Sequence, residues 1–203
     1  MESELLSSDI IAKKLASPNL IDPVSEFPPT YFDSPARPAA ILMPLLRTKG
    51  EWHLFYIRRT EVPGDYHSGQ VAFPGGARDP QDQNLQATAL REANEEVGLV
   101  AENVKILGNL PDVHTISNYH VTPFVGDIRW PFNISISEDE VVRAFTIPLK
   151  WLADKNNFRF ESRDIPGTSK PHPVIYYEKY EGELLWGLSA RLTIVFLKTI
   201  NLL

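Results

Sequence analysis

The stretch that decides the fold of this chain runs from Gly75 to Leu99 and reads GGARDPQDQNLQATALREANEEVGL. The two adjacent glycines at its start allow a tight turn. The segment from Leu85 to Val97 has apolar residues at helical spacing, and the glycine that follows is typical of a helix C-terminus. The sequence therefore predicts a glycine turn, a short loop, a helix and a stop at Gly98.

Three carboxylates share one side of this predicted helix. At about 100° of rotation per residue, Glu92, Glu95 and Glu96 fall within an arc of about 100°. The small and aliphatic residues between 89 and 97 lie on a neighbouring arc, which can face a hydrophobic core. The helix is thus expected to be anchored by one face and to present three carboxylates on another.

This grouping of charge is unfavourable without a partner. Glu92 and Glu96 are like charges four residues apart, near the helix end at which the macrodipole disfavours negative charge. A divalent cation offsets both effects, and oxygen-only ligands suit Mg²⁺ or Mn²⁺. A solvated acidic helix end is the alternative, but the glycine turn, the arginine before Glu92 and the glycine stop together favour a metal site. We therefore predict as metal ligands Glu92, Glu95 and Glu96.

The whole stretch resembles the Nudix box, G-x5-E-x7-R-E-U-x-E-E-x-G-U, in which U is a bulky aliphatic residue. The matching positions are Gly76, Arg91, Glu92, Glu95, Glu96, Gly98 and Leu99. Asp82 replaces the first glutamate, residues 83–90 make a spacer of eight instead of seven, and Ala93 occupies an aliphatic position. The resemblance implies an α+β Nudix fold, with a mixed β-sheet between helices. It also implies a diphosphatase that hydrolyses a nucleoside diphosphate linked to another moiety.

The departures are similar to the coenzyme A diphosphatase branch of that family, which also has aspartate with the longer spacing. The segment from His67 to Phe73, HSGQVAF, resembles the motif associated with CoA, and further similar stretches reach Arg191. The resemblance covers roughly residues 38 to 200. It implies CoA or acyl-CoA as the substrate, with 3′,5′-ADP and (acyl-)4′-phosphopantetheine as products.

One loop differs from that branch. An arginine is usual four residues before the motif glycine, where this chain has Asp65, and Arg59 lies one residue further from Gly69 than expected. Because this loop is thought to read the CoA moiety, ADP-ribose, NADH and dinucleotides stay open as substrates. An inactive Nudix-fold ligand-binding module is the alternative of another class. Such modules usually lose carboxylates of the box, and all three glutamates are present here.

The remaining site predictions concern catalysis and substrate binding. We expect catalytic roles for Arg91, Glu92, Glu95 and Glu140, with the general base left open between a glutamate of the box and Glu140. Arg91 is expected to orient a carboxylate such as Asp82 by charge-assisted hydrogen bonds. The residues expected to bind substrate are Arg58, Arg59, His67, Gly75, Gly76 and Arg78. The pair Arg58 and Arg59 supplies the nearest cations for the 3′-phosphate of CoA, and the solvated surface is the alternative place for them.

Outside the box, strands and helices are mixed without a βαβ rhythm, which indicates an α+β fold. Strands are predicted at 39–46, 52–57, 70–73, 103–110, 119–128, 140–147, 158–161 and 174–178, and helices at 8–16, 149–153 and 189–200. The first two strands should form a hairpin around Lys49-Gly50. We expect an N-terminal helix and proline-rich arm at 1–37, followed by the Nudix domain at 38–203.

Composition limits the partners. The chain has 203 residues, a net charge of −6 and no cysteine, which excludes disulfides, cysteine nucleophiles and thiolate zinc sites. A binder of nucleic acid polymers normally has a basic face, so a small nucleotide substrate is the expected partner. No signal peptide or membrane span is apparent, and a cytoplasmic location is expected. A homodimer is a possible assembly.

Overall fold

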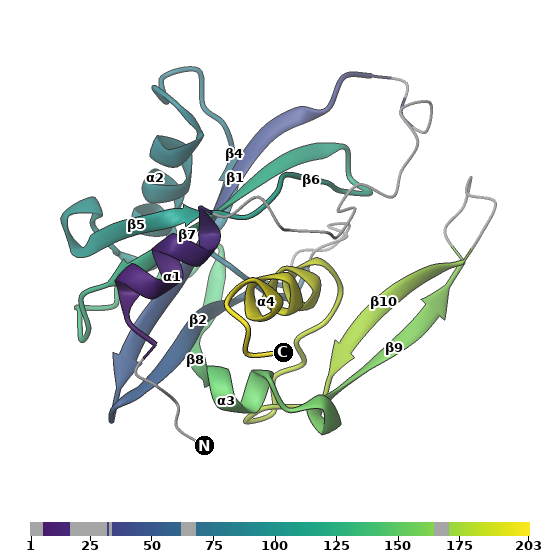
Figure 1. The fold of residues 1–203 in the computed structure, drawn as a ribbon. Helices are drawn as coiled ribbons and strands as arrows, with labels where there is room; N and C mark the ends of the chain where they lie inside the picture. The colour runs from purple at the N-terminus through teal and green to yellow at the C-terminus, as the bar shows by residue number, and fades with distance from the viewer. Residues whose placement is uncertain (1–5, 17–31, 33, 62–67, 165–170) are drawn as a thin grey trace.

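A computed structural model describes residues 6–16, 32, 34–61, 68–164 and 171–203 (Figure 1). The helices are α1 (Ser8–Leu15), α2 (Leu85–Val97), α3 (Leu149–Leu152) and α4 (Gly187–Thr199), with short 3-10 turns at η2 (Ala101–Asn103) and η3 (Lys155–Asn157). The strands are β1 (Arg37–Thr48), β2 (Glu51–Arg59), β3 (Val71–Ala72), β4 (Gly75–Ala77), β5 (Val104–Asn109), β6 (Val113–His114), β7 (Tyr119–Ile128), β8 (Val141–Pro148), β9 (Phe158–Arg163) and β10 (His172–Tyr177).

The main sheet is mixed, with β1 near its centre. Its strands follow the order β3-β2-β1-β7-β5, while β8 pairs with β2, β4 with β1 and β6 with β7. The pairing of β1 with β7 is parallel, and the other pairings are antiparallel. A parallel neighbour on one side and antiparallel neighbours on the other confirm the predicted mixed sheet.

Alternate residues of β1 and β2 serve two separate cores. Met43 and Tyr56 face the core that contains α1 and α4, whereas Leu42 and Phe55 face the core around α2. All four side chains are fully buried. Burial of successive residues on opposite faces explains why these strands are apolar runs, and it places helices on both sides of the sheet (Figure 1). The predicted fold class is therefore confirmed.

The predicted elements agree with the structure, with small differences in their bounds. Gly75 and Gly76 were expected only in a turn, but they form β4, which pairs with the start of β1. The short β6 was not predicted, since its two residues give too little pattern to detect. The helix within the predicted N-terminal segment 1–37 packs onto the domain, because Ile11 and Leu15 lie in the same core as α4. The proline-rich residues 17–31 lie outside the described part of the chain.

The hairpin of β9 and β10 forms a separate two-stranded sheet beside α4 (Figure 1). Ile175 and Tyr177 of β10 are buried in the α4 core, and the backbone N–H of Tyr177 donates to the carbonyl of Leu185 at 2.9 Å. The hairpin is therefore attached to the body through β10. Among the described residues, no helix is both long and apolar enough to cross a membrane.

Candidate functional site

Helix α2 is fixed at both of its ends. Asn84 caps its N-terminus by accepting a hydrogen bond from the backbone N–H of Ala87 at 2.9 Å. Gly98 ends it with a left-handed φ of +73°, as predicted. The backbone N–H groups of Ser135 and Ser137 then donate to the carbonyls of Val97 and Glu96, at 3.1 Å and 3.0 Å. These bonds satisfy terminal carbonyls of the helix and hold the segment before β8 against it.

The two glycines of β4 allow the backbone to lie directly on α2. The backbone N–H of Gly75 donates to the carboxylate of Glu96 at 3.0 Å. A Cβ on Gly75 would come within 2.5 Å of the carbonyl oxygen of Ala40, and one on Gly76 within 2.6 Å of the Glu92 carboxylate. Only glycine fits at either position without displacing the neighbouring strand or the carboxylate.

A pocket of about 260 Å³ opens where β4, α2 and the end of β2 meet. It is lined by residues from four separate segments of the chain: Arg59, Thr60, Gly75, Gly76, Ala77, Glu92, Glu96, Asp139 and Glu140. Carboxylates from α2 and from the segment before β8 therefore share a cavity with one arginine and a glycine backbone.

Hydrogen bonds to the end of β2 hold Glu140 in this pocket. The backbone N–H of Thr60 donates to the carbonyl of Glu140 at 2.9 Å, and the Thr60 hydroxyl donates to the carbonyl of Glu138 at 3.3 Å. Ser137 holds the other side through its bond to the end of α2. Glu140 and the neighbouring Asp139 are thus placed by main-chain contacts, although they lie more than 40 residues from α2 in sequence.

The carboxylates of α2 are buried to different extents. Burial raises the pKa of Glu96 to about 8, and burial also raises the pKa of Glu92. Arg59 lies 4.0 Å from Glu96 and offsets part of this effect. The metal-ligating side chains that line the pocket offer oxygen atoms only, and buried carboxylates of this kind fit a hard divalent cation. In the part of the chain that the structure describes, no three acidic or histidine side chains are already grouped closely enough to hold one.

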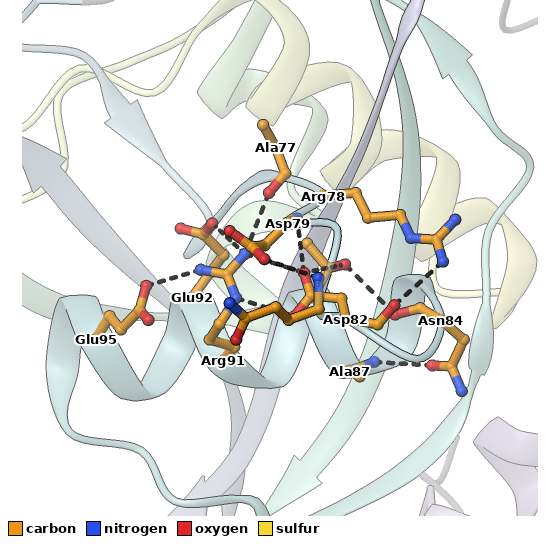
Figure 2. A network of polar contacts seen from close by, with 11 residues as sticks. Ala77, Arg78, Asp79, Asp82, Asn84, Ala87, Arg91, Glu92 and Glu95 are labelled. Carbon is orange, nitrogen blue, oxygen red and sulfur yellow. Dashed lines mark hydrogen bonds and ion pairs between the residues drawn. The ribbon is translucent and has the colours of Figure 1, made fainter.

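Arg91 accounts for the position of the third glutamate (Figure 2). Its guanidinium lies 2.8 Å from the Glu95 carboxylate and 2.9 Å from that of Glu92. The same group donates to Asp82 at 3.0 Å and 3.1 Å and to the carbonyl of Ala77 at 3.1 Å. The expected contact between Arg91 and Asp82 is therefore confirmed. Glu95 is half exposed and lies with Arg91, outside the pocket that Glu92 and Glu96 line.

The model of the NUDIX domain matches residues 35–165, which include β1, the pocket and α2. This chain belongs to the Nudix family. A protein named "Uncharacterized Nudix hydrolase NudL" from Yersinia pestis is 43% identical over 162 residues, which cover 79% of this chain and 78% of that protein. The chain is accordingly a Nudix hydrolase, a diphosphatase of a class that generally uses divalent metal ions and small-molecule nucleotide substrates.

Solved structures are similar in fold. A MutT/nudix family protein from Enterococcus faecalis matches with a TM-score of 0.56 at 15% identity, over 87% of this chain and 65% of that one. A Nudix hydrolase from Alicyclobacillus acidocaldarius matches with a TM-score of 0.50 at 18% identity, over 60% of this chain and 83% of that one. At these identities the likeness concerns the Nudix fold alone.

The structure separates the predicted substrate-binding residues of this Nudix hydrolase. Arg59 lines the pocket with Gly75 and Gly76, but Arg58 does not, since its guanidinium lies 3.3 Å from Glu61 and 3.8 Å from Glu183. Arg58 and Arg59 are adjacent on a strand, so their side chains leave opposite faces of the sheet.

Two further residues predicted to bind substrate lie elsewhere. Arg78 is exposed on the loop before α2 and donates to the carbonyl of Asp82 at 3.1 Å, outside the pocket lining. His67 lies outside the described residues. Sequence analysis missed Asp139 and Thr60, which line the pocket. The acidic run that contains Asp139 and Glu140 is a signal for the first of them, whereas nothing in the sequence distinguishes Thr60.

Proposed function

We propose that this Nudix hydrolase cleaves the diphosphate bond of CoA or acyl-CoA with Mg²⁺ or Mn²⁺, giving 3′,5′-ADP and (acyl-)4′-phosphopantetheine. The observation that supports it most is the path of residues 69–76, the part of the chain that resembles the CoA-associated motif and its glycine turn. This segment runs along the end of β2 and continues directly into the glycines of the pocket.

Main-chain contacts join this segment to Arg59. The backbone N–H of Arg59 donates to the carbonyl of Gln70 at 3.0 Å, and the N–H of Gly69 donates to the carbonyl of Thr60 at 3.3 Å. β3 adds a short antiparallel pairing with β2. The CoA-like motif is therefore bonded to Arg59 and Thr60, which line the cavity together with residues of the Nudix box. This arrangement suits a single substrate that contacts both.

The carboxylates of the pocket supply the metal ligands of this proposal. Glu92 and Glu96 would hold the cation from α2, and Glu95 would join them if its side chain left Arg91. When bound, the cation neutralises phosphate charge and lowers the pKa of a water molecule. The bond from Gly75 to Glu96 keeps that carboxylate fixed at the edge of the cavity.

The other pocket residues have roles in positioning and proton transfer. Arg59 is placed to donate to phosphate oxygens next to the cation, a contact that charge strengthens. Glu140 lines the cavity from the segment before β8 and is a candidate to accept the proton of the attacking water. In the overall reaction, water oxygen bonds to one phosphorus and the bond from that phosphorus to the bridging oxygen breaks.

The test is product analysis on a panel of CoA, acetyl-CoA, dephospho-CoA, ADP-ribose and NADH with each metal. The proposal expects the highest kcat/KM on CoA or its thioester, with 3′,5′-ADP as the nucleotide product. Preference for ADP-ribose or NADH would replace the substrate and keep the diphosphatase chemistry. Binding of CoA by calorimetry without turnover of any compound would instead favour a ligand-binding module.

A further inference from the structure

Strand β9 lies on the outer side of its hairpin, away from α4 (Figure 1). In the described part of the chain it has one strand partner, β10. Phe160, in the middle of β9, is 61% exposed, which is the highest value among the large hydrophobic side chains that the structure describes. A free strand edge with an exposed aromatic residue at its centre is a surface on which another strand can pair.

Side chains alternate along β9 in both charge and polarity. Phe158 and Phe160 point to the face that carries the buried Ile175 of β10, whereas Arg159 and Glu161 point to the other. Charged side chains on an edge strand usually discourage association, but charges of opposite sign can pair with each other across two strands. Here the charges are opposite in sign and flank the aromatic residue symmetrically.

We propose that β9 pairs with β9 of a second copy of this chain, antiparallel, about a two-fold axis that passes midway between the two copies of Phe160. In this register Phe160 lies opposite the partner subunit's Phe160. Arg159 then lies opposite Glu161 of the partner subunit, and the symmetry repeats that ion pair. The two hairpins form a four-stranded sheet in the order β10-β9-β9-β10.

Charge selects this register over its neighbours. A pairing centred on Glu161 places that carboxylate opposite itself and Arg159 opposite Arg163 of the partner subunit. A pairing centred on Arg159 places two arginines opposite each other. Like charges directly opposite in a sheet are destabilising, so the register centred on Phe160 is favoured.

The ion pairs that exist within one copy are not a strong obstacle. Arg159 lies 2.9 Å from Glu161 and 3.0 Å from Glu178, and all three side chains are largely exposed. Exposed pairs of this kind contribute little to stability. The pairing therefore costs little electrostatically, while it covers the aromatic ring and satisfies the outer backbone groups of β9.

A cysteine at position 160 tests the register directly, because the natural chain has no cysteine. Opposite residues of an antiparallel pair have Cα atoms about 4.5–5.5 Å apart, within the range that a disulfide spans. We expect Phe160→Cys to form a covalent dimer under mild oxidation. Val142→Cys is the matched control, since Val142 is also exposed on an edge strand, and it should stay monomeric on a non-reducing gel.

Mixing two charge variants tests the same register without a covalent bond. Arg159→Glu places two carboxylates opposite each other in its own dimer, and Glu161→Arg places two guanidinium groups there. Each variant alone should dissociate at least about tenfold more readily than the wild type. An equimolar mixture should dimerise, because both cross-strand pairs are then opposite in charge. Light scattering after gel filtration measures the mass, and circular dichroism checks that each variant is folded.

Three results would overturn the proposal. One is a monomeric wild type at high micromolar concentration. Another is cross-linking of Phe160→Cys that does not exceed that of Val142→Cys. The third is a wild-type dimer that neither charge variant weakens, which would place the interface on another surface.

Discussion

Arg91 donates two hydrogen bonds to the carboxylate of Asp82, at 3.0 Å from its Nε and 3.1 Å from its Nη2. The Asp82 carboxylate is buried and also accepts from the backbone N–H of Asp79 and from the hydroxyl of Thr88, each at 2.9 Å. One side chain therefore holds the loop before α2 against the helix that carries Glu92, Glu95 and Glu96. The aspartate and the spacer of eight residues are the two departures from the general Nudix box that meet in this contact.

Removal of the Asp82 carboxylate should destabilise the fold. We expect Asp82→Ala to lower the free energy of unfolding by about 1.5–3 kcal/mol, since a charged, hydrogen-bonded group is lost and its donors stay partly buried. Glu95→Gln is the matched control, because Glu95 also contacts Arg91 but is half exposed, and its effect should be well under half as large. Urea unfolding in EDTA measures the free energy of unfolding of both variants. Equal effects would show that the loop is held by other contacts.

The interaction between Arg91 and Asp82 should make the free energy of unfolding depend on pH. The hydrogen bonds from Arg91 hold the pKa of Asp82 at about 2, below its ordinary value of 3.8. A carboxyl group with a lowered pKa stabilises the fold fully above its ordinary pKa, and this contribution is lost as the pH falls through the folded value. The difference in unfolding free energy between the wild type and Asp82→Asn should therefore shrink between about pH 4 and about pH 2. A difference that stays constant over this window would contradict the assignment.

Most of the helices and strands could be predicted from the sequence, because each depends on a pattern of neighbouring residues. The alternation of apolar residues, the run from Leu85 to Val97 and the stop at Gly98 place strands and the helix within one or two residues of their observed bounds. The parallel pairing of β1 with β7 could not be predicted in this way. It depends on which faces two distant segments bury, and no local pattern in either segment records that.

The geometry of the site was predictable only within α2, although Arg59 and Glu140 from other segments were among the predicted residues and line the pocket. The arc of glutamates on α2 was expected, but the helical arc did not reveal that Glu96 would be buried and Glu95 half exposed. That difference arises from what packs against each edge of the arc, β4 on one side and solvent on the other. Arg59 reaches Glu96 from β2, so the nearest cation in space is not the nearest one in sequence.

Metal removal should abolish activity. We expect no turnover in EDTA and full recovery with Mg²⁺ or Mn²⁺, because the pocket offers oxygen ligands only. The cation should also raise the melting temperature of the wild type, since it binds the folded chain and not the unfolded one. Full activity in a preparation shown by elemental analysis to lack divalent metal would exclude the proposed chemistry.

Removal of a carboxylate charge from α2 should lower the activity but raise the stability of the metal-free protein. Glu96→Gln is expected to lower kcat by about a hundredfold or more, because a group that holds the cation is lost. In EDTA the same variant should melt at a higher temperature than the wild type, since a buried carboxylate is costly without a cation. Calorimetric titration with Mn²⁺ should show weaker binding.

Two further variants complete this series. Glu95→Gln should also lower kcat strongly if Glu95 leaves Arg91 to join the cation, but it should not raise the melting temperature, because Glu95 is already exposed. Glu102→Gln, at an exposed carboxylate just beyond α2, is the control and should change neither property. A near-normal kcat in Glu95→Gln would remove that residue from the metal site.

The two adjacent arginines at the end of β2 allow a matched test of substrate contact. Arg59 lines the pocket 4.0 Å from Glu96, whereas Arg58 lies on the opposite face near Glu183. The place of Arg59 beside Glu96, a proposed metal ligand, favours contact with the diphosphate over the 3′-phosphate, which was its expected ligand from sequence. A charge-assisted contact contributes about 1.5–3 kcal/mol, so Arg59→Ala should lower kcat/KM by roughly tenfold to a hundredfold.

That loss should be the same on CoA and on dephospho-CoA, since both carry the diphosphate and only CoA carries the 3′-phosphate. Arg58→Ala removes the same side chain one residue away and should leave kcat/KM within about threefold on both substrates, because an interaction outside the reaction does not change transition-state binding. Steady-state kinetics gives the ratio of variant to wild-type kcat/KM for each of the two variants on each of the two substrates. A loss in Arg59→Ala that is confined to CoA would assign Arg59 to the 3′-phosphate. A larger loss in Arg58→Ala than in Arg59→Ala would move the phosphate contact to the other face of the sheet.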